Sequence, residues 1–380
     1  MSSLSLIEWT EGGTTHSARW RSESGAPPPQ HVVVADDRIT ADAAYRLASA
    51  GTALLWRGDF QNARQLLQAM ARRIDRKPRQ GAAQTPDPAT AFQRYRQAQA
   101  RRARTLGMLL LPFDGDYQVP LRRAPDVRQA CSAAYGPAPD AHEHFVTSLR
   151  ELLGLIGAHE WRKKGVAIPA LGARIYPHYG VFAPIRGEYV DLVATAPLPP
   201  ACKLAFDIGT GSGVLAAVLA RRGIARVAAT DQDPRALACA ADNMERLALT
   251  GQVELVAVDL FPAGRAPLIV CNPPWIPYSA SSPLERAVFD PDSRMLMGFL
   301  GGLADHLEPG GEGWLILSDL AEHLGLRTRT ELLSAVDAAG LKVIGRQDVR
   351  PHHPRVADVA DPLHAARAKE VTSLWRLALR

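Results

Sequence analysis

One stretch decides the fold of this chain: Leu204-Ala-Phe-Asp-Ile-Gly-Thr-Gly-Ser-Gly-Val-Leu215. An apolar run leads to a carboxylate, Asp207, and then to three alternating glycines and an apolar helical pattern that begins at Val214. This order predicts a strand, a tight turn and a helix. Glycines tolerate positive φ and let a ligand come close to the backbone, and a helix N-terminus offers N–H groups that the helix itself does not use. The stretch therefore predicts a ligand site, with an ordinary strand–turn–helix connection as the alternative.

The spacing of the glycines narrows the kind of ligand. Gly209, Gly211 and Gly213 alternate, whereas the dinucleotide fingerprint G-x-G-x-x-G requires its third glycine where this chain has Val214. The pattern D-x-G-x-G-x-G resembles motif I of the class I S-adenosylmethionine-dependent methyltransferases. The resemblance implies that the turn, Thr210 included, holds the methionine part of S-adenosyl-L-methionine and not a pyrophosphate.

The positive charge of the chain lies in its N-terminal part. Residues 1–165 hold 23 Lys and Arg against 16 Asp and Glu, a net charge of +7, whereas residues 166–380 hold 21 against 23, a net charge of −2. A basic region beside a near-neutral one is typical of proteins that contact a polyanion. A compositional origin is the alternative, because Arg and Ala are abundant throughout the chain while Lys is scarce.

The sequence shows no pattern typical of a metal site, a disulfide framework or a membrane span. The four cysteines are Cys131, Cys202, Cys239 and Cys271. They form no C-x-x-C pair, which argues against a structural zinc and a disulfide framework and makes a reducing cytoplasm the expected compartment. His142 and His144 are two residues apart, so on a helix they do not face one metal. Apolar runs such as Leu106–Phe113 are too short to span a membrane. We therefore expect neither a metal nor a membrane partner.

The pattern of elements divides the chain into four regions. Residues 1–80 are predicted to be helical, and residues 81–165 to be a linker followed by basic and amphipathic helices, one of them over 142–156. Residues 166–195 are predicted to form a β-hairpin, a loop and a helix. Residues 196–380 alternate strands and helices, which predicts a Rossmann-like α/β sheet of seven strands with helices on both faces. We expect ligands at the carboxyl ends of these strands, and a mostly helical domain before them.

Carboxylates end the first three predicted strands of that sheet. Asp231 ends the second, 18 residues past the last glycine, where a carboxylate can accept both ribose hydroxyls. Its alternative role is to cap the next helix, although Asp233 is better placed for that. Motif I implies that Asp207 fixes the glycine turn at the methionine end of the cofactor. The resemblance also implies that Asp259, followed by Leu260, faces the adenine amino group.

The motif that predicts the reaction is Leu268-Ile-Val-Cys-Asn-Pro-Pro-Trp-Ile276. After the apolar strand, Pro273 and Pro274 cannot continue a sheet ladder and fix the direction of their backbone carbonyls. Asn272 supplies one acceptor and two donors beside the cofactor, and Trp275 supplies a π face. Together they can hold a planar –NH2 group and direct its nitrogen lone pair toward an electrophilic methyl group. In-line positioning then does most of the catalysis, so all four residues are predicted to be catalytic.

This motif resembles the signature Asn/Asp/Ser-Pro-Pro-Tyr/Phe/Trp of N-methyltransferases. Between about Val181 and Gly311 the chain resembles in particular the protein-(glutamine-N5) methyltransferases that modify release factors, the HemK-like family. Asn243 and the segment Val258-Asp-Leu-Phe261 also follow that family's pattern. The chain departs from it where Trp275 replaces the usual Tyr and where an insert over residues 350–371 separates the last two strands.

A loop before motif I extends the resemblance upstream. Val181-Phe-Ala-Pro-Ile-Arg-Gly-Glu188 resembles the family's segment that ends in Pro-Arg-x-x-Thr-Glu. The resemblance implies that Phe182, Pro184 and Arg186 contact the substrate together with Trp275, and that Arg186 lies near the cofactor pocket.

Two classes of function follow. The first is an S-adenosylmethionine-dependent N-methyltransferase that acts on a planar nitrogen, with a protein glutamine side chain first and an rRNA base, a DNA base or a small molecule as alternatives. The second is a methyltransferase-like module that binds a partner without turnover. The intact motif from Asn272 to Trp275 argues against the second class.

Overall fold

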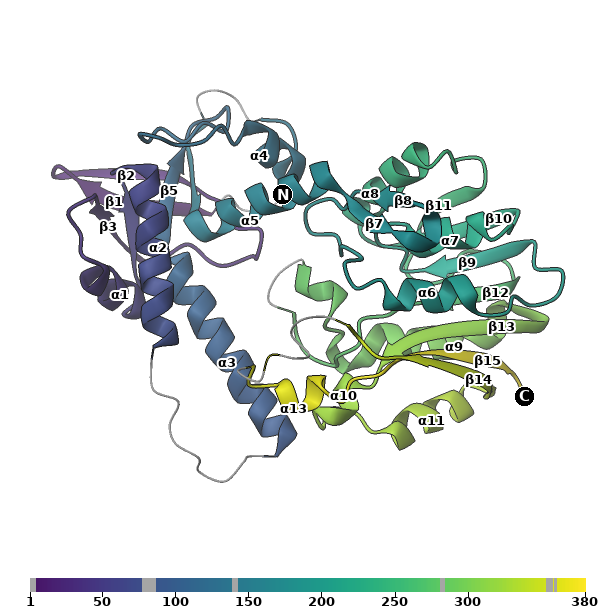
Figure 1. The fold of residues 1–380 in the computed structure, drawn as a ribbon. Helices are drawn as coiled ribbons and strands as arrows, with labels where there is room; N and C mark the ends of the chain where they lie inside the picture. Colours follow the sequence, from purple (N-terminus) through teal and green to yellow (C-terminus); the bar gives the residue numbers. More distant parts are fainter. Residues whose placement is uncertain (1–4, 77–86, 139–142, 281–283, 353–357, 359–360) are drawn as a thin grey trace. The chain divides into compact units, whose positions relative to one another are not determined.

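The computed structural model describes residues 5–76, 87–138, 143–280, 284–352, 358 and 361–380. The chain forms two compact units, shown in Figure 1. The first unit comprises residues 1–85 and 93–160, and the second comprises residues 86–92 and 161–380. Helices α3 (Pro88–Gly107) and α5 (Leu149–Lys164) each have residues in both units.

The first unit is organised around a mixed sheet of six strands. In spatial order these strands are β1 (Leu6–Glu11), β2 (Thr14–Trp20), β6 (Phe145–Ser148), β5 (Leu109–Phe113), β4 (Thr52–Trp56) and β3 (His31–Ala35). Its other helices are α1 (Ala41–Ser49), α2 (Phe60–Asp75) and α4 (Arg128–Tyr135). Side chains cap the first two of these helices, because the Thr40 side chain accepts a hydrogen bond from the Ala43 backbone and the Asp59 side chain accepts one from Gln61.

This sheet corrects the prediction of a mostly helical N-terminal domain. Residues 145–148, which we expected in a helix over 142–156, form strand β6, and helix α5 begins only at Leu149. Phe145 pairs with Phe113 across the antiparallel β5–β6 ladder, and their rings stack with centroids 4.7 Å apart. A short apolar run fits a strand or a buried helix equally well, so the tertiary partner decides. Residue 142 and most of the predicted linker, residues 77–86, lie outside the described residues.

The second unit contains a twisted sheet of seven strands. Their order is β11 (Val253–Ala257), β10 (Arg226–Asp231), β9 (Leu204–Ile208), β12 (Ala266–Cys271), β13 (Leu307–Ser318), β15 (Thr372–Leu379) and β14 (Leu341–Val349). Only β15 runs antiparallel to its neighbours. The chain goes from β9 outward to β10 and β11, then returns to the other side of β9 for β12. The predicted Rossmann-like sheet is confirmed, and its strand order reverses between β9 and β12, where such sheets bind ligands.

Helices connect and cover these strands. They are α6 (Glu188–Thr195), α7 (Val214–Arg221), α8 (Pro234–Arg246), α9 (Arg294–His306), α10 (Leu320–His323), α11 (Arg329–Ala338) and α13 (His364–Arg367), with three short 3₁₀ helices, η1 (Pro169–Leu171), η2 (Leu284–Ala287) and η3 (Pro291–Ser293). The predicted hairpin consists of β7 (Val166–Ile168) and β8 (Ala173–Ile175), joined through Gly172 in the left-handed conformation. The insert between β14 and β15 contributes α13, while its residues 353–357 and 359–360 are not described.

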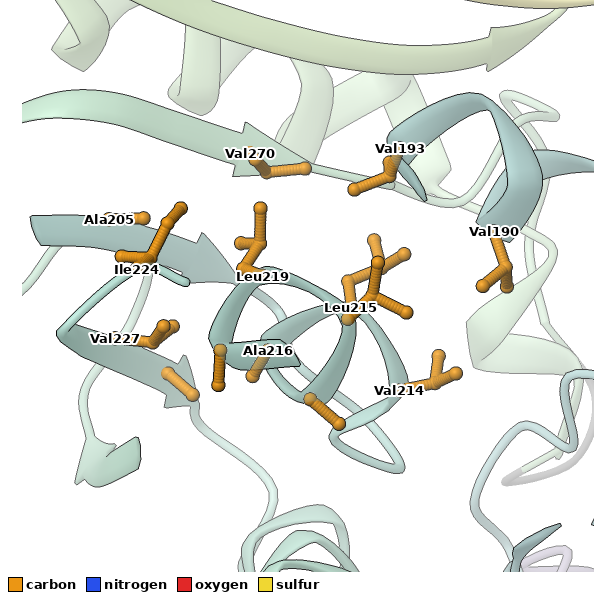
Figure 2. Packing of buried hydrophobic residues seen from close by; sticks show 14 of the residues in the cluster. Val190, Val193, Ala205, Val214, Leu215, Ala216, Leu219, Ile224, Val227 and Val270 are labelled. Atoms are coloured by element: carbon orange, nitrogen blue, oxygen red, sulfur yellow. The ribbon is translucent and has the colours of Figure 1, made fainter. Parts of the chain in front are cut away.

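Two apolar clusters cover the two faces of the seven-stranded sheet. One packs α6 and α7 against β9 and β12, and Figure 2 shows Leu215 and Leu219 of α7 gathered with Val193 of α6 and Val270 of β12. The other packs α9 and α11 on the opposite face, through residues such as Phe299. Burial of both faces of β9 and β12 explains their continuous apolar runs and fixes the height at which each strand ends. Among the described residues, no helix combines the length and the apolar character that crossing a membrane requires.

Candidate active site

The glycine turn after β9 has the conformation that its sequence predicts. Gly209, Gly211 and Gly213 have φ of 70°, 55° and 81°, in the left-handed region that side chains disfavour. The turn is held by its neighbours, because the Thr210 N–H donates to the Thr230 carbonyl at 2.8 Å and the Gly213 N–H donates back to the Thr210 carbonyl at 2.9 Å. A Cβ built on Gly211 would meet no atom within 4 Å, so the open side of the turn faces free space. That is the form of a backbone cradle for a ligand.

Asp207 fixes this turn from beneath. Its carboxylate is 1% exposed, and one oxygen, Oδ2, accepts hydrogen bonds from the Thr210 hydroxyl at 2.7 Å and from the Ala216 N–H at 3.0 Å. Burial raises the pKa of Asp207 to about 6, against the lowering effect of these two bonds. Asp207 therefore ties the end of β9 to the glycine turn and to the first turn of α7.

Asp231 lies at the end of β10, directly beside the turn. Its Oδ2 accepts the Gly211 N–H at 3.0 Å, and its Oδ1 accepts the Asp233 N–H at 2.9 Å. Burial raises the pKa of Asp231, and these backbone bonds oppose the increase. An ionised carboxylate has about four acceptor positions, so two remain for a ligand. Helix α8 is capped by Asp233, which accepts the Arg235 N–H, so the alternative role of Asp231 as that cap is excluded.

The loop after β11 places Asp259 and Leu260 at the same edge of the sheet. Asp259 forms an ion pair with Arg294 of α9. Leu260 has a φ of 69°, which is uncommon for a residue with a branched side chain, and its carbonyl accepts the Thr230 hydroxyl at 2.6 Å. Thr230 also lies beside the glycine turn, so its hydrogen bond fixes the loop after β11 relative to that turn. The sequence offered no signal for the Arg294 partner.

The Asn272–Trp275 turn follows β12, the strand next to β9. Cys271 pairs with Ile208 in the β9–β12 ladder, so Asn272 begins level with Gly209. The indole Nε1–H of Trp275 donates to the Asn272 Oδ1 at 2.8 Å. The ring of Trp275 also packs against both apolar clusters of the unit. Pro273 is buried and Pro274 is half-buried between them. The four predicted catalytic residues are therefore brought to the edge that carries the predicted cofactor residues.

Two further contacts hold this turn from outside the motif. Arg327, which is only 6% exposed, donates to the Trp275 carbonyl at 3.4 Å. Ile276 exchanges backbone hydrogen bonds with the segment before η3, donating to Val288 at 3.1 Å and accepting from Asp290 at 2.9 Å. Sequence analysis identified neither contact, because each partner lies in a part of the chain without a recognised motif.

The loop before motif I meets the C-terminal insert. The Arg186 guanidinium lies 3.4 Å from the carboxylate of Glu370, which is 2% exposed and also accepts the Ser318 hydroxyl at 2.8 Å. Pro184 is buried, and Phe182 packs against the cluster of α6 and α7. The described contacts thus hold Arg186 on Glu370, and none of them joins Arg186 to the glycine turn.

Asn243 of α8 joins the hairpin to the glycine turn. It is fully buried, its Oδ1 accepts the Tyr176 N–H at 2.8 Å, and its Nδ2 donates to the Ser212 carbonyl at 3.0 Å. The family pattern marked this position, and the structure supplies its physical role. The described residues contain no group of three or more His, Cys, Asp or Glu side chains positioned to hold a metal ion.

Comparisons with known proteins agree with this geometry. Residues 198–273 match the family of ribosomal protein L11 methyltransferase, PrmA. A protein of Pelotomaculum thermopropionicum named ribosomal protein L11 methyltransferase is 37% identical over 146 residues, covering 38% of this chain and 39% of its own. A release factor glutamine methyltransferase of Cereibacter sphaeroides is 33% identical over 170 residues, covering 41% of this chain and 58% of its own. The chain thus spans less than two thirds of the length of either relative.

Among solved structures, a SAM-dependent methyltransferase from Thiobacillus denitrificans in complex with S-adenosyl-L-homocysteine covers 51% of this chain and 91% of its own, with 16% identity and a TM-score of 0.35. The second unit is thus similar in sequence to methyltransferases, whose cofactor is S-adenosyl-L-methionine. The residues present fit that cofactor, since Gly211 is open, Asp231 retains acceptor positions and Asn272 follows the strand next to β9.

Proposed function

We propose that this chain is an S-adenosylmethionine-dependent N-methyltransferase that modifies a protein, with a glutamine side-chain amide as its first acceptor. One observation carries the proposal: the Asn272–Trp275 turn stands at the end of β12, level with the glycine turn of β9. The cofactor supplies a methyl group on a positively charged sulfur. The residues of the chain therefore need only to orient a planar nitrogen and to exclude water. A strong base is not required.

Each site residue has a distinct part in this proposal. Asp231 accepts the ribose hydroxyls, and the glycine turn supports the methionine part. Oδ1 of Asn272 has two lone pairs, of which one receives the Trp275 indole N–H. The other is free to accept an N–H of the acceptor amide. Holding both amide hydrogens in place turns the nitrogen lone pair toward the methyl group, which lowers the barrier by orientation.

The methyl transfer requires no reactant other than the cofactor and the acceptor amide. A nitrogen–carbon bond forms as the sulfur–carbon bond breaks, and the electron pair of the broken bond goes to sulfur. The methylated nitrogen then carries an extra proton, which it loses to water. Because an amide nitrogen becomes strongly acidic once methylated and charged, the proton needs no dedicated side chain.

A protein amine is the second candidate acceptor. It is favoured by the family match at residues 198–273 and by relatives named ribosomal protein L11 methyltransferase. An amine is protonated at neutral pH and must lose a proton before it reacts, so its methylation would accelerate as the pH rises. An amide has no such requirement. The two acceptors therefore predict different pH–rate profiles.

The test begins with calorimetric binding of S-adenosyl-L-methionine to the purified chain. Methyl-labelled cofactor is then incubated with a ribosome-containing cell extract, and the product is treated with nuclease or with protease. We expect label that protease releases and nuclease does not. Acid hydrolysis separates the acceptors, because a methylated amide releases volatile methylamine while a methylated amine side chain survives. Label in nucleic acid, or the absence of cofactor binding, would contradict the proposal.

A further inference from the structure

One face of α9 receives three successive residues of the loop after β11. Arg294 pairs with Asp259, a Cβ on Gly298 would lie 2.6 Å from Leu260 Cδ1, and a Cβ on Gly302 would lie 2.5 Å from Phe261 Cε2. The three α9 residues are spaced by four, so they form one row along the helix. We call Arg294, Gly298 and Gly302 the α9 row. Asp259, Leu260 and Phe261 lie along it in chain order.

Gly298 and Gly302 of the α9 row allow the loop after β11 to approach the helix closely. A glycine inside a helix is destabilising relative to alanine, so each of the three glycines of α9 calls for a physical reason. At Gly298 and Gly302 the reason is contact, because a methyl group would occupy the position of a loop side chain. At Gly301, on another face of the same helix, a Cβ would meet nothing within 4 Å. The contrast shows that the row, and not the helix as a whole, is fitted to the loop.

The loop needs such support because its backbone is strained. Leu260 holds a left-handed φ of 69°, and only surrounding structure can keep a branched residue there. Thr230 grips the Leu260 carbonyl from one side. Phe261 is stacked between Phe299 and His306 of α9, with ring centroids 5.9 Å and 4.3 Å away. Contacts from β10 on one side and from α9 on the other therefore fix the conformation of the loop after β11.

We infer that the α9 row positions Asp259 and Leu260 for the adenine end of the cofactor, with Arg294 and Gly298 as positioning residues. The inference rests on the proposed function, since it assigns a role to residues that support the same cofactor. Arg294 orients the Asp259 carboxylate by holding its Oδ2, which leaves Oδ1 to accept from the adenine amino group. The side chains of Arg294 and Asp259 are 62% and 45% exposed, so this ion pair adds little to the stability of the fold. Its main effect is to orient the Asp259 carboxylate.

The main test compares Gly298→Ala with Gly301→Ala. Each replaces a helical glycine of α9 with alanine, so each should raise the melting temperature by about 2–4 °C, less any cost of moving Leu260. Only Gly298→Ala displaces Leu260. We expect it to weaken S-adenosyl-L-homocysteine binding about tenfold, the scale of one misplaced hydrogen bond, while Gly301→Ala binds as the parent does. Equal affinity of the two variants for S-adenosyl-L-homocysteine in calorimetry would overturn the inference.

A second pair keeps the test valid if Gly298→Ala does not fold. Arg294→Ala removes an exposed side chain at the row, and Arg226→Ala removes one from a similar surface ion pair with Glu254, at the amino end of β10. Arg294→Ala should weaken binding of S-adenosyl-L-homocysteine roughly three- to tenfold, and Arg226→Ala should not. The inosine analogue, in which oxygen replaces the adenine amine, should bind equally well to Arg294→Ala and to the parent.

The outcomes separate this inference from the proposed function. A parent chain that binds neither S-adenosylmethionine nor its homocysteine product would overturn both. A parent that binds them, with Arg294→Ala and Arg226→Ala indistinguishable, would overturn the α9 row alone. An equal loss of affinity for the adenine and inosine compounds would show that the row supports the fold of the loop without directing Asp259 at the amine, which also contradicts the inference.

Discussion

The proposed cofactor side and the proposed acceptor side of the second unit are held in different ways. By cofactor side we mean the loops after β9, β10 and β11, and by acceptor side the turn after β12 with residues 181–188. On the cofactor side, Asp207 and Asp231 bind backbone groups close by in the chain, while Asp259 pairs with the Arg294 side chain 35 residues ahead. Asp207 reaches Ala216, nine residues ahead, and Asp231 reaches Gly211, twenty residues behind.

On the acceptor side, the corresponding partners are distant side chains. Arg186 meets Glu370, 184 residues further along the chain, and the Trp275 carbonyl meets Arg327, 52 residues further along. The difference teaches that the cofactor side is constrained by local geometry, which changes little when distant segments change. The acceptor side is constrained by whatever segments surround it, including the insert at 350–371. Changes in substrate between relatives would then arise mainly from the acceptor side.

The largest expected effect breaks the acceptor side alone. Asn272→Ala should lower methyl transfer by about 10²–10³, the cost of losing one preorganised polar contact to the transition state. It should leave cofactor affinity unchanged, because the proposed site directs Asn272 at the acceptor amide and the adenosine at the ends of β10 and β11. Label transfer into extract and calorimetric cofactor binding, measured side by side, check this prediction.

Asn272→Asp is the matched variant for this first change. A carboxylate oxygen can still accept from the Trp275 indole and from the acceptor, so its loss of activity should be smaller. Near-parental transfer by Asn272→Ala would show that the turn only ends a strand, and that the acceptor side lies elsewhere.

The second effect concerns the cofactor side and appears as a pH dependence of stability. The folded pKa of Asp207 is raised to about 6 from its ordinary value of 3.8, so the folded state binds the proton more tightly than the unfolded state. Its contribution is therefore fully present below about pH 4 and is lost as the pH rises through 6. A shift of about two units corresponds to about 3 kcal/mol of unfolding free energy.

Asp207→Asn isolates that contribution. Both donors use the same carboxylate oxygen, so an amide oxygen can accept the Thr210 hydroxyl and the Ala216 N–H without ionising. Urea unfolding at pH 4 and pH 7 should show that the parent loses about 3 kcal/mol more than the variant over this range. Equal losses in the two proteins would mean that Asp207 is not charged and buried as its geometry indicates.

The same contrast explains what sequence alone can predict. The glycine turn, Asp207, Asp231 and the strand ends around them were predicted because each is constrained by neighbours within a few dozen residues. Asp231 was predicted to end the second strand of the sheet, and it is the last residue of β10. Arg327 and Glu370 were not identified, because a buried charge gives no local signal and its partner is chosen by the completed fold.

The N-terminal sheet was missed for a related reason. Residues 145–148 are four residues long and become a strand by pairing with β5, more than thirty residues earlier, and with β2, more than a hundred residues earlier. Local periodicity favoured a helix, and the long-range pairing outweighed it. Helices α1 and α2, by contrast, carry their own caps and apolar faces, and both lie in the region of residues 1–80 that was predicted to be helical.

The third effect sharpens the assignment of the cofactor side. Asp231→Ala should weaken binding of S-adenosyl-L-methionine by about 10- to 100-fold, the range for hydrogen bonds to a charged group. The matched control is Asp233→Ala, which removes the cap of α8 and should cost stability without a comparable loss of affinity. Calorimetry on both variants decides the matter. If Asp231→Ala binds the cofactor as tightly as Asp233→Ala, the ribose assignment is wrong.

The smallest expected effect tests whether Trp275 acts by stacking or through its indole N–H. Trp275→Phe keeps an aromatic face but removes the donor that holds the Asn272 Oδ1 at 2.8 Å. Without that donor the Asn272 amide can rotate, so its second lone pair no longer points at the acceptor. We expect turnover to fall about tenfold, the scale of one hydrogen bond, with a smaller change in the acceptor concentration at half-maximal rate.

Two comparisons make that last measurement decisive. Trp275→Ala removes face and donor together, so it should raise the half-maximal acceptor concentration as well as lower turnover. Trp20→Phe removes an indole N–H that donates to the Ala26 carbonyl at 2.7 Å in the N-terminal unit, and it should leave transfer unchanged. A Trp275→Phe enzyme with parental turnover would show that stacking alone explains the tryptophan. In that case the two prolines and Arg327, and not the Trp275 indole N–H, would fix the orientation of Asn272.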